Sequence, residues 1–156
     1  MLKTVSSAGG GGGATPPGGS TTQIQYNNAG AFAGTSRLTF DGTTLAVSNP
    51  TVTNYIETLY APAAGSAFTV DLTNGTVQKF SLNANGTITL PASAAGKSFV
   101  IMLAQDGTGS RTVTWSGVTW PGGTAPTVTS TASKMDIYSF FSDGTNTYGV
   151  TVGQNY

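Results

Sequence analysis

The chain has neither cysteine nor histidine among its 156 residues. Without cysteine it can form no disulfide and no thiolate metal site. Without histidine it lacks the commonest general base and metal ligand, and a Ser-His-Asp triad is impossible. The 6 acidic residues are scattered, and their spacing pairs no two of them as the acid and base of a glycosidase. We therefore expect no enzyme, no cofactor and no metal site.

Charge is also scarce, because only 8% of the residues are charged and the net charge is zero. A typical soluble domain has about 25% charged residues. Clustered Lys and Arg are absent, so we expect no nucleic-acid partner. No apolar run approaches the roughly 20 residues that a membrane span needs, and the N-terminus lacks the apolar core of a secretory signal. We expect a protein made in the cytoplasm, without membrane insertion, whose uncharged surface favours association with its own copies.

What the sequence has is threonine, glycine and alternation. Between residues 99 and 156, apolar and hydroxyl residues alternate in short runs that end in glycine-containing turns, which is typical of antiparallel β-structure. Asn74-Gly75 and Asn85-Gly86 suit type I′ hairpin turns. The fold class we predict is all-β, an antiparallel β-sandwich or jelly roll. We expect its strands near residues 52–61, 67–72, 77–82, 87–90, 98–105, 112–116, 127–131, 135–142 and 148–154.

Composition divides the chain into three regions. Residues 1–19 are rich in Gly and Pro and have few sizeable side chains, so we interpret them as an attachment peptide anchored by Leu2 and Val5. Residues 20–48 form a small β module with too few large apolar groups for a core of its own, and oligomerisation is the usual remedy. Residues 49–156 are long enough to form the main β domain.

The acidic residues that precede glycine have a structural explanation. Asp41, Asp106 and Asp143 are each followed by Gly, and Asp-Gly is a turn dipeptide because Asp can bond to its own backbone while Gly supplies a positive φ. The segment 106–109 could offer oxygen atoms to a hard cation, but it lacks the further carboxylates of a tight Ca²⁺ site.

Aromatic residues gather in the C-terminal third and are the candidate receptor contacts. Trp120, Tyr148 and Tyr156 are the residues that we single out, because an aromatic ring can pack on the face of a sugar. The alternative for Trp120 is packing against Pro121 to hold its own loop. Trp115 and Phe140 fit a core role better.

Two stretches resemble a known family. The first has an Asp-Gly-Thr-Gly turn from Asp106, a Thr-Val-Thr-Trp strand, Trp-Pro-Gly-Gly-Thr-Ala-Pro-Thr from Trp120, an apolar strand ending Phe-Phe and a closing hairpin with Tyr-Gly. The second is Gly-Gly-Ser-Thr-Thr-Gln-Ile-Gln-Tyr-Asn-Asn-Ala-Gly-Ala-Phe from Gly18. Together they resemble the C-terminal domain and a short module of tailed-bacteriophage fibre and appendage proteins.

That resemblance implies a virion protein that assembles as a homotrimer. Residues 1–19 would bind other virion proteins, residues 20–48 would form a slender neck, and residues 49–156 would be a head that presents loops to a host-surface glycan. The chain would be assembled into virions in the host cytoplasm, as a short fibre or appendage on the tail tip, neck or head. The alternative is a capsid decoration or adaptor protein that binds no receptor. An enzyme such as a capsular depolymerase is the least favoured class.

Overall fold

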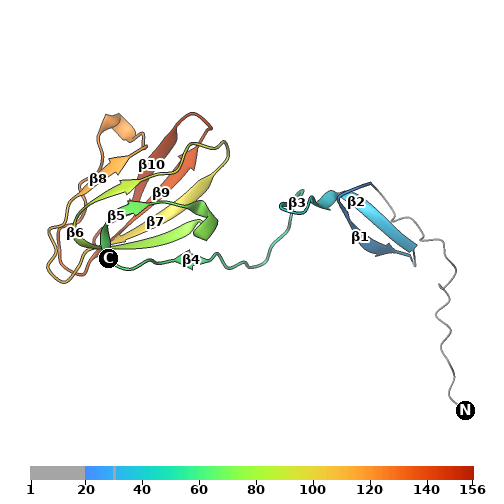
Figure 1. Ribbon diagram of the computed structural model, residues 1–156, viewed down its shortest axis with the longest axis horizontal. Helices are drawn as coiled ribbons and strands as arrows, with labels where there is room; N and C mark the ends of the chain where they lie inside the picture. The colour runs from blue at the N-terminus through green and yellow to red at the C-terminus, as the bar shows by residue number, and fades with distance from the viewer. Residues whose placement is uncertain (1–19, 30) are drawn as a thin grey trace, which may run out of the picture. The chain divides into compact units, whose positions relative to one another are not determined.

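The computed structural model describes residues 20–29 and 31–156, which belong to two compact units, residues 1–54 and residues 55–156. The elements of the described residues are strands and two single-turn 3₁₀ helices, η1 (Leu72–Asn74) and η2 (Pro121–Gly123) (Figure 1). The all-β prediction is therefore confirmed. No helix in these residues is long and apolar enough to cross a membrane.

The first unit is an antiparallel sheet of β1 (Gln23–Asn28), β2 (Ala31–Phe40) and β3 (Leu45–Val47), in that order. The turn between β2 and β3 is the predicted Asp-Gly turn. The carboxylate of Asp41 accepts hydrogen bonds from the backbone N–H groups of Thr43 at 2.9 Å and Thr44 at 2.7 Å.

One face of this small sheet is apolar. Leu38 pairs with Val47, and Phe40 pairs with Leu45, so all four side chains point to the same side because strand residues alternate between faces. Phe40, Leu45 and Val47 are about half exposed. None of the side chains that the structure describes in this unit is buried, so the described residues form no core of their own.

The second unit is a seven-stranded arrangement built around one long strand. Its main path runs β10-β9-β7-β6-β4, while β5 and β8 also pair with β6. The strands are β4 (Leu59–Tyr60), β5 (Gly65–Thr69), β6 (Val77–Thr89), β7 (Ser98–Ala104), β8 (Val113–Ser116), β9 (Met135–Ser142) and β10 (Thr147–Gly153).

Strand β6 belongs to both layers of this unit. Its first half pairs with β4 and β7, and its second half pairs with β5 and β8. The prediction of two strands joined by an Asn85-Gly86 hairpin was wrong. Gly86 instead lies inside β6, at a position that requires glycine because a Cβ there would be 2.8 Å from the Ser66 carbonyl oxygen. The Asn85 side chain accepts a hydrogen bond from Thr112 N–H at 3.0 Å.

The strand directions also correct the purely antiparallel prediction. The β7–β9 and β9–β10 pairs are antiparallel, but every pairing of β6 is parallel. Asn74-Gly75 is not a hairpin turn, because it ends η1 on a connection between the parallel strands β5 and β6. Gly75 has φ 133°, and a Cβ there would collide with the Thr58 carbonyl oxygen.

Two of the predicted strands are reduced or missing in the second unit. The region 52–61 contributes only the two residues of β4, and residues 127–131, all of which the structure describes, form no strand. The jelly-roll arrangement stays a prediction.

The core of the second unit is aromatic. Along β7 and β9 every second residue is buried, which is the alternation of a sheet with one covered face. Phe68 stacks on Phe80 with ring centroids 4.6 Å apart, and Phe99 stacks on Phe140 at 4.9 Å. Burial of each such ring is worth about 1.5–3 kcal/mol. The Phe68–Phe80 stack and the edge-on contact of Trp115 with Tyr138 tie the layer of β5 and β8 to the inner face of the main sheet. The outer face of that sheet is left uncovered.

Candidate binding surfaces

Trp120 lies in the aromatic core, immediately before η2. Its side chain is only 7% exposed. The ring meets Trp115 edge-on at 5.3 Å and Tyr138 at 6.0 Å. Gly149 makes room for it, because a Cβ there would be 2.6 Å from Trp120 Cζ3. This burial favours the packing interpretation of Trp120 and leaves little of the indole for a sugar.

Tyr148 is held at the surface by the hairpin that precedes β10. It is 41% exposed, and its hydroxyl donates to the Asp143 carboxylate at 3.0 Å. The other oxygen of Asp143 accepts from the backbone N–H groups of Thr145 at 2.8 Å and Asn146 at 2.7 Å. These bonds, with that from Tyr148, hold the pKa of Asp143 below its usual value. The predicted turn role of Asp143 is confirmed, and the Tyr148 ring is accessible.

Asp106 fills a similar turn role. Its carboxylate accepts from the N–H groups of Thr108 at 3.0 Å and Gly109 at 2.8 Å, and it forms an ion pair with Arg111 at 2.8 Å. Both oxygens are thus already engaged. No group of three or more potential metal-ligating residues (His, Cys, Asp or Glu) occurs in residues 20–29 and 31–156.

Tyr156 is exposed at the opposite end of the sheet from Tyr148. It is 58% exposed, and its backbone exchanges hydrogen bonds with Met135 at the start of β9. Tyr148 instead pairs with Phe141 near the end of β9. The structure therefore does not bring Tyr148 and Tyr156 into one patch. The anchor candidates Leu2 and Val5 lie outside the described residues.

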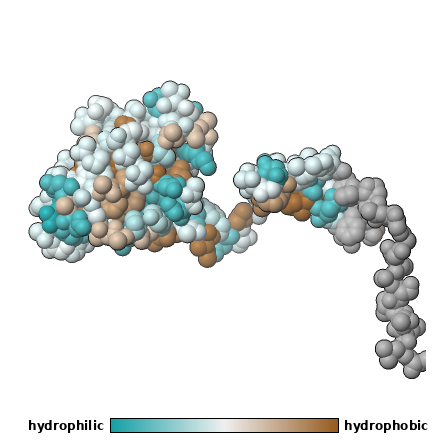
Figure 2. All heavy atoms as spheres, viewed as in Figure 1, coloured by the Kyte–Doolittle hydropathy of each residue, from teal (hydrophilic) through white to brown (hydrophobic). Residues whose placement is uncertain are grey.

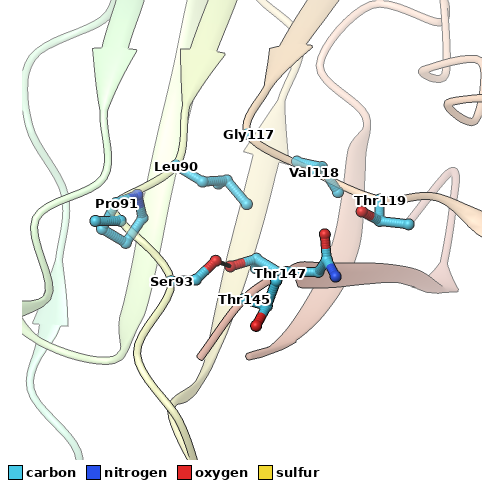
Figure 3. Close-up of a pocket in the computed structure, with 10 residues that line it drawn as sticks. Leu90, Pro91, Ser93, Gly117, Val118, Thr119, Thr145 and Thr147 are labelled. Carbon is cyan, nitrogen blue, oxygen red and sulfur yellow. Dashed lines mark hydrogen bonds between the residues drawn. The ribbon is translucent and has the colours of Figure 1, made fainter. Parts of the chain in front are cut away.

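Sequence reasoning missed a pocket of about 480 Å³ at one end of the second unit. Three segments of chain line it (Figure 3): the residues after β6, those after β8 and the β9–β10 hairpin. The only sequence signal was the abundance of threonine in these turns. The lining residues are Leu90, Pro91, Ala92, Ser93, Gly117, Val118, Thr119, Thr145, Asn146 and Thr147.

Hydrogen bonds tie the walls of this pocket together. The Ser93 and Thr147 hydroxyls are 3.2 Å apart, and Figure 3 shows them pointing toward each other. Thr119 N–H donates to the Thr147 carbonyl at 2.8 Å. The backbone N–H of Ala94 donates to the Ser142 hydroxyl at 3.0 Å. The pocket is therefore a built feature of the loops.

The outer face of the main sheet is a second candidate surface, which we call the outer face. The strand register aligns one row across it, from Leu59 through Val77, Val100 and Ser139 to Val150. Lys79 is its one charged residue within residues 55–156, all described. Figure 2 shows hydrophobic residues reaching the surface of this unit. The apolar members are Leu59, Val77, Val100, Met102, Ala104, Met135, Ile137, Phe141, Tyr148 and Val150.

Two adjacent large apolar side chains are also uncovered in the stretch of chain that leads into β4. Ile56 is 93% exposed and Tyr55 71% exposed. Side chains of this kind are normally exposed singly rather than in succession. Only Glu57 and Thr58 separate this pair from Leu59 on the outer face.

Comparison with known proteins shows the family of the chain. Residues 68–147 match the family described as "Putative phage tail fibre C-terminal domain", over just more than half of the chain. The chain belongs to this family. The match spans β5 to the start of β10, and thus the aromatic core and the pocket, and it confirms the resemblance seen in the sequence. No curated protein and no solved structure matches the chain. The protein is therefore a structural fibre protein of a phage and a component of the virion.

Proposed function

We propose that this fibre protein is a short homotrimeric fibre or appendage whose C-terminal unit binds the host surface. In this proposal residues 1–19 bind another virion protein, residues 20–48 form the neck, and residues 49–156 form the head. The observation that carries the assembly is the outer face, which a single chain leaves uncovered. The count of three chains follows the family resemblance.

The chemistry of the outer face suits copies of the same chain. Lys79 is the only charge on it, so it offers almost nothing for a partner of opposite charge to recognise. Apolar surfaces of this kind are typical of permanent contacts between subunits. The uncovered Tyr55 and Ile56 extend the same surface and would be buried together with it. Residues 20–54, which bury no described side chain, would gain their core in the same step.

Light scattering on the purified protein tests the assembly. We expect a mass three times the 15.7 kDa of one chain. Ile56→Asp should lower that mass, because it places a charge in the proposed contact between chains. Ile56 is 93% exposed in the single chain, so the substitution should not affect the folding of that chain. Asn54→Asp is the matched control and should leave the trimer intact. A monomeric wild-type protein would contradict the proposed architecture.

Host binding is tested by adsorption of the purified protein to cells of the phage's host strain. We expect adsorption without other virion proteins. The burial of Trp120 favours a second candidate, a decoration or adaptor protein, because it removes the largest aromatic candidate from the surface. Such a protein would adsorb to virions lacking it and not to cells.

Deletion of residues 1–19 tests the attachment role of the N-terminus. The truncated protein should remain a soluble trimer and be absent from virions. If it still enters virions, the attachment site lies elsewhere in the chain.

A further inference from the structure

We propose that the pocket between the loops after β6, after β8 and between β9 and β10 binds a neutral carbohydrate. This inference rests on the proposed host binding and deepens it. It assigns the ligand class and the residues, and it moves the site from the exposed aromatic residues to the threonine-rich end of the unit.

The lining of the pocket matches the two kinds of surface that a sugar presents. Leu90, Pro91 and Val118 supply apolar contact for the C–H groups of a sugar ring, and Figure 3 shows Leu90 and Val118 on one side of the Ser93–Thr147 pair. Hydroxyl and amide groups on the other walls can both donate and accept hydrogen bonds. A volume of about 480 Å³ lies within the range of about 300–1,000 Å³ that is typical of small-molecule sites.

Charge decides in favour of a neutral ligand. No residue that lines the pocket is charged, so a phosphate or a carboxylate would enter without a cation to pair with it. Asp143, in the adjacent hairpin, has both oxygens engaged by backbone N–H groups and by Tyr148. An acidic sugar would meet this carboxylate as a like charge, which disfavours its binding.

The polar groups are held in place before any ligand arrives. In the Ser93–Thr147 pair one hydroxyl donates to the other, which leaves the accepting hydroxyl with its own hydrogen free to donate to a ligand. The bond from Thr119 to Thr147 and the turn bonds of Asp143 fix the neighbouring walls. Little ordering is then required on binding, which benefits affinity.

The test uses the full-length protein, wild type and variants, on an array of neutral and acidic oligosaccharides and on host cells. Thr145→Tyr places a bulky ring at the rim, where Thr145 is exposed, and should block the pocket. Thr131→Tyr is the control, because Thr131 is equally an exposed loop threonine outside the pocket. Ser93→Ala removes one hydroxyl and should weaken binding about tenfold or less, as the loss of one or two neutral hydrogen bonds implies.

The expected result is binding to one or more neutral oligosaccharides that Thr145→Tyr abolishes and Thr131→Tyr retains, with the melting temperature unchanged in both. Binding to acidic oligosaccharides alone would overturn the ligand class. Binding that survives Thr145→Tyr would overturn the site. If the wild-type protein adsorbs to cells but binds no oligosaccharide on the array, this inference is overturned and the proposed host binding stands. If the wild-type protein does not adsorb to cells at all, the proposed host binding and this inference both fail.

Discussion

The two units of this chain use the same β-strand chemistry and reach opposite results. In residues 55–156 the alternation of β7 and β9 turns one face of the sheet onto a second layer, and aromatic rings fill the space between. In residues 20–54 the pairs Leu38–Val47 and Phe40–Leu45 align in the same way, but the residues of that unit that the structure describes form no second layer. Alternation therefore predicts which face is apolar, and only a second layer makes that face a core.

The second unit shares one property with the first, because it too has an uncovered apolar face. Its inner face is buried within one chain, and its outer face, with Val77, Val100 and Val150, is uncovered like the face of the small sheet. We expect substitutions on the inner face to unfold a chain, and substitutions on either uncovered face to separate chains.

The largest effect should follow from Trp120→Ala. Truncation of a buried Trp costs about 3–5 kcal/mol, and Trp120 contacts both Trp115 and Tyr138. Denaturant unfolding at equal chain concentration measures it. Tyr156→Ala, at a side chain 58% exposed, should cost about 1 kcal/mol or less. A loss below about 1 kcal/mol for Trp120→Ala would show that the ring is no part of the core.

Asp136→Asn should have the next largest effect. This buried carboxylate accepts from Thr129 N–H at 2.7 Å, Asn155 N–H at 3.0 Å and the Tyr138 hydroxyl at 3.0 Å. The amide cannot accept all of these bonds, and a buried donor without a partner costs about 1–3 kcal/mol. We expect a loss of about 2 kcal/mol at neutral pH in denaturant unfolding.

The loss at Asp136 should also depend on pH. Burial raises the pKa of its carboxyl, but the bonds from Thr129, Asn155 and Gln154 outweigh it, and the pKa is lowered. A lowered folded-state pKa gives stability that is present above the unfolded-state pKa of about 3.9 and is lost as the pH falls through the folded-state pKa. The difference between wild type and Asp136→Asn should therefore shrink below about pH 4. A difference that is constant with pH would contradict an ionised Asp136 in the folded state.

A smaller effect, on association, is expected for Phe40→Asp in the small sheet. Phe40 is 48% exposed, so burial of the rest of its ring by another chain would contribute about 1 kcal/mol per chain, half or less of full burial. The trimer should dissociate at a higher protein concentration, as measured by analytical ultracentrifugation. Ala46→Asp carries the same charge on the other face of β3 and is the control. Equal effects of the two variants would show that the apolar face is not the contact.

Much of the fold could be predicted from the sequence, because local chemistry determines it. The strand at residues 135–142 and the Asp-Gly turns at Asp41 and Asp143 form as expected. Asn85-Gly86 misled because the glycine serves a close approach of β5 to β6, a tertiary contact that no dipeptide reveals. The parallel partners of β6 are likewise set by which segments the fold brings beside it.

The sites were harder to predict than the strands. Exposed aromatic residues are the usual signal of a sugar contact, but Trp120 and Tyr148 have similar surroundings in sequence and opposite burial in the structure. The pocket depends on three turns that are distant along the chain, and its threonines look like ordinary turn residues. The hydrogen bonds between Ser93, Thr119 and Thr147 in the folded structure show that these turns meet.

The smallest effect should follow from Tyr148→Phe. The change removes the hydroxyl that donates to Asp143 at 3.0 Å and keeps the ring. Because the bond is at the surface and screened by water, its loss should change the free energy of unfolding only slightly. The pKa of Asp143 should rise toward its usual value, since Tyr148 is one of the groups that lower it, and NMR titration measures that rise. Tyr156→Phe is the control and should leave the pKa of Asp143 unchanged.

Tyr148→Phe also separates two roles of Tyr148, receptor contact by the ring and the hydrogen bond of the hydroxyl. If the ring contacts a receptor, Tyr148→Phe should adsorb to cells like wild type while Tyr148→Ala should not. Equal adsorption by both variants would remove Tyr148 from the receptor site and leave it as the tie that holds the hairpin beside the pocket.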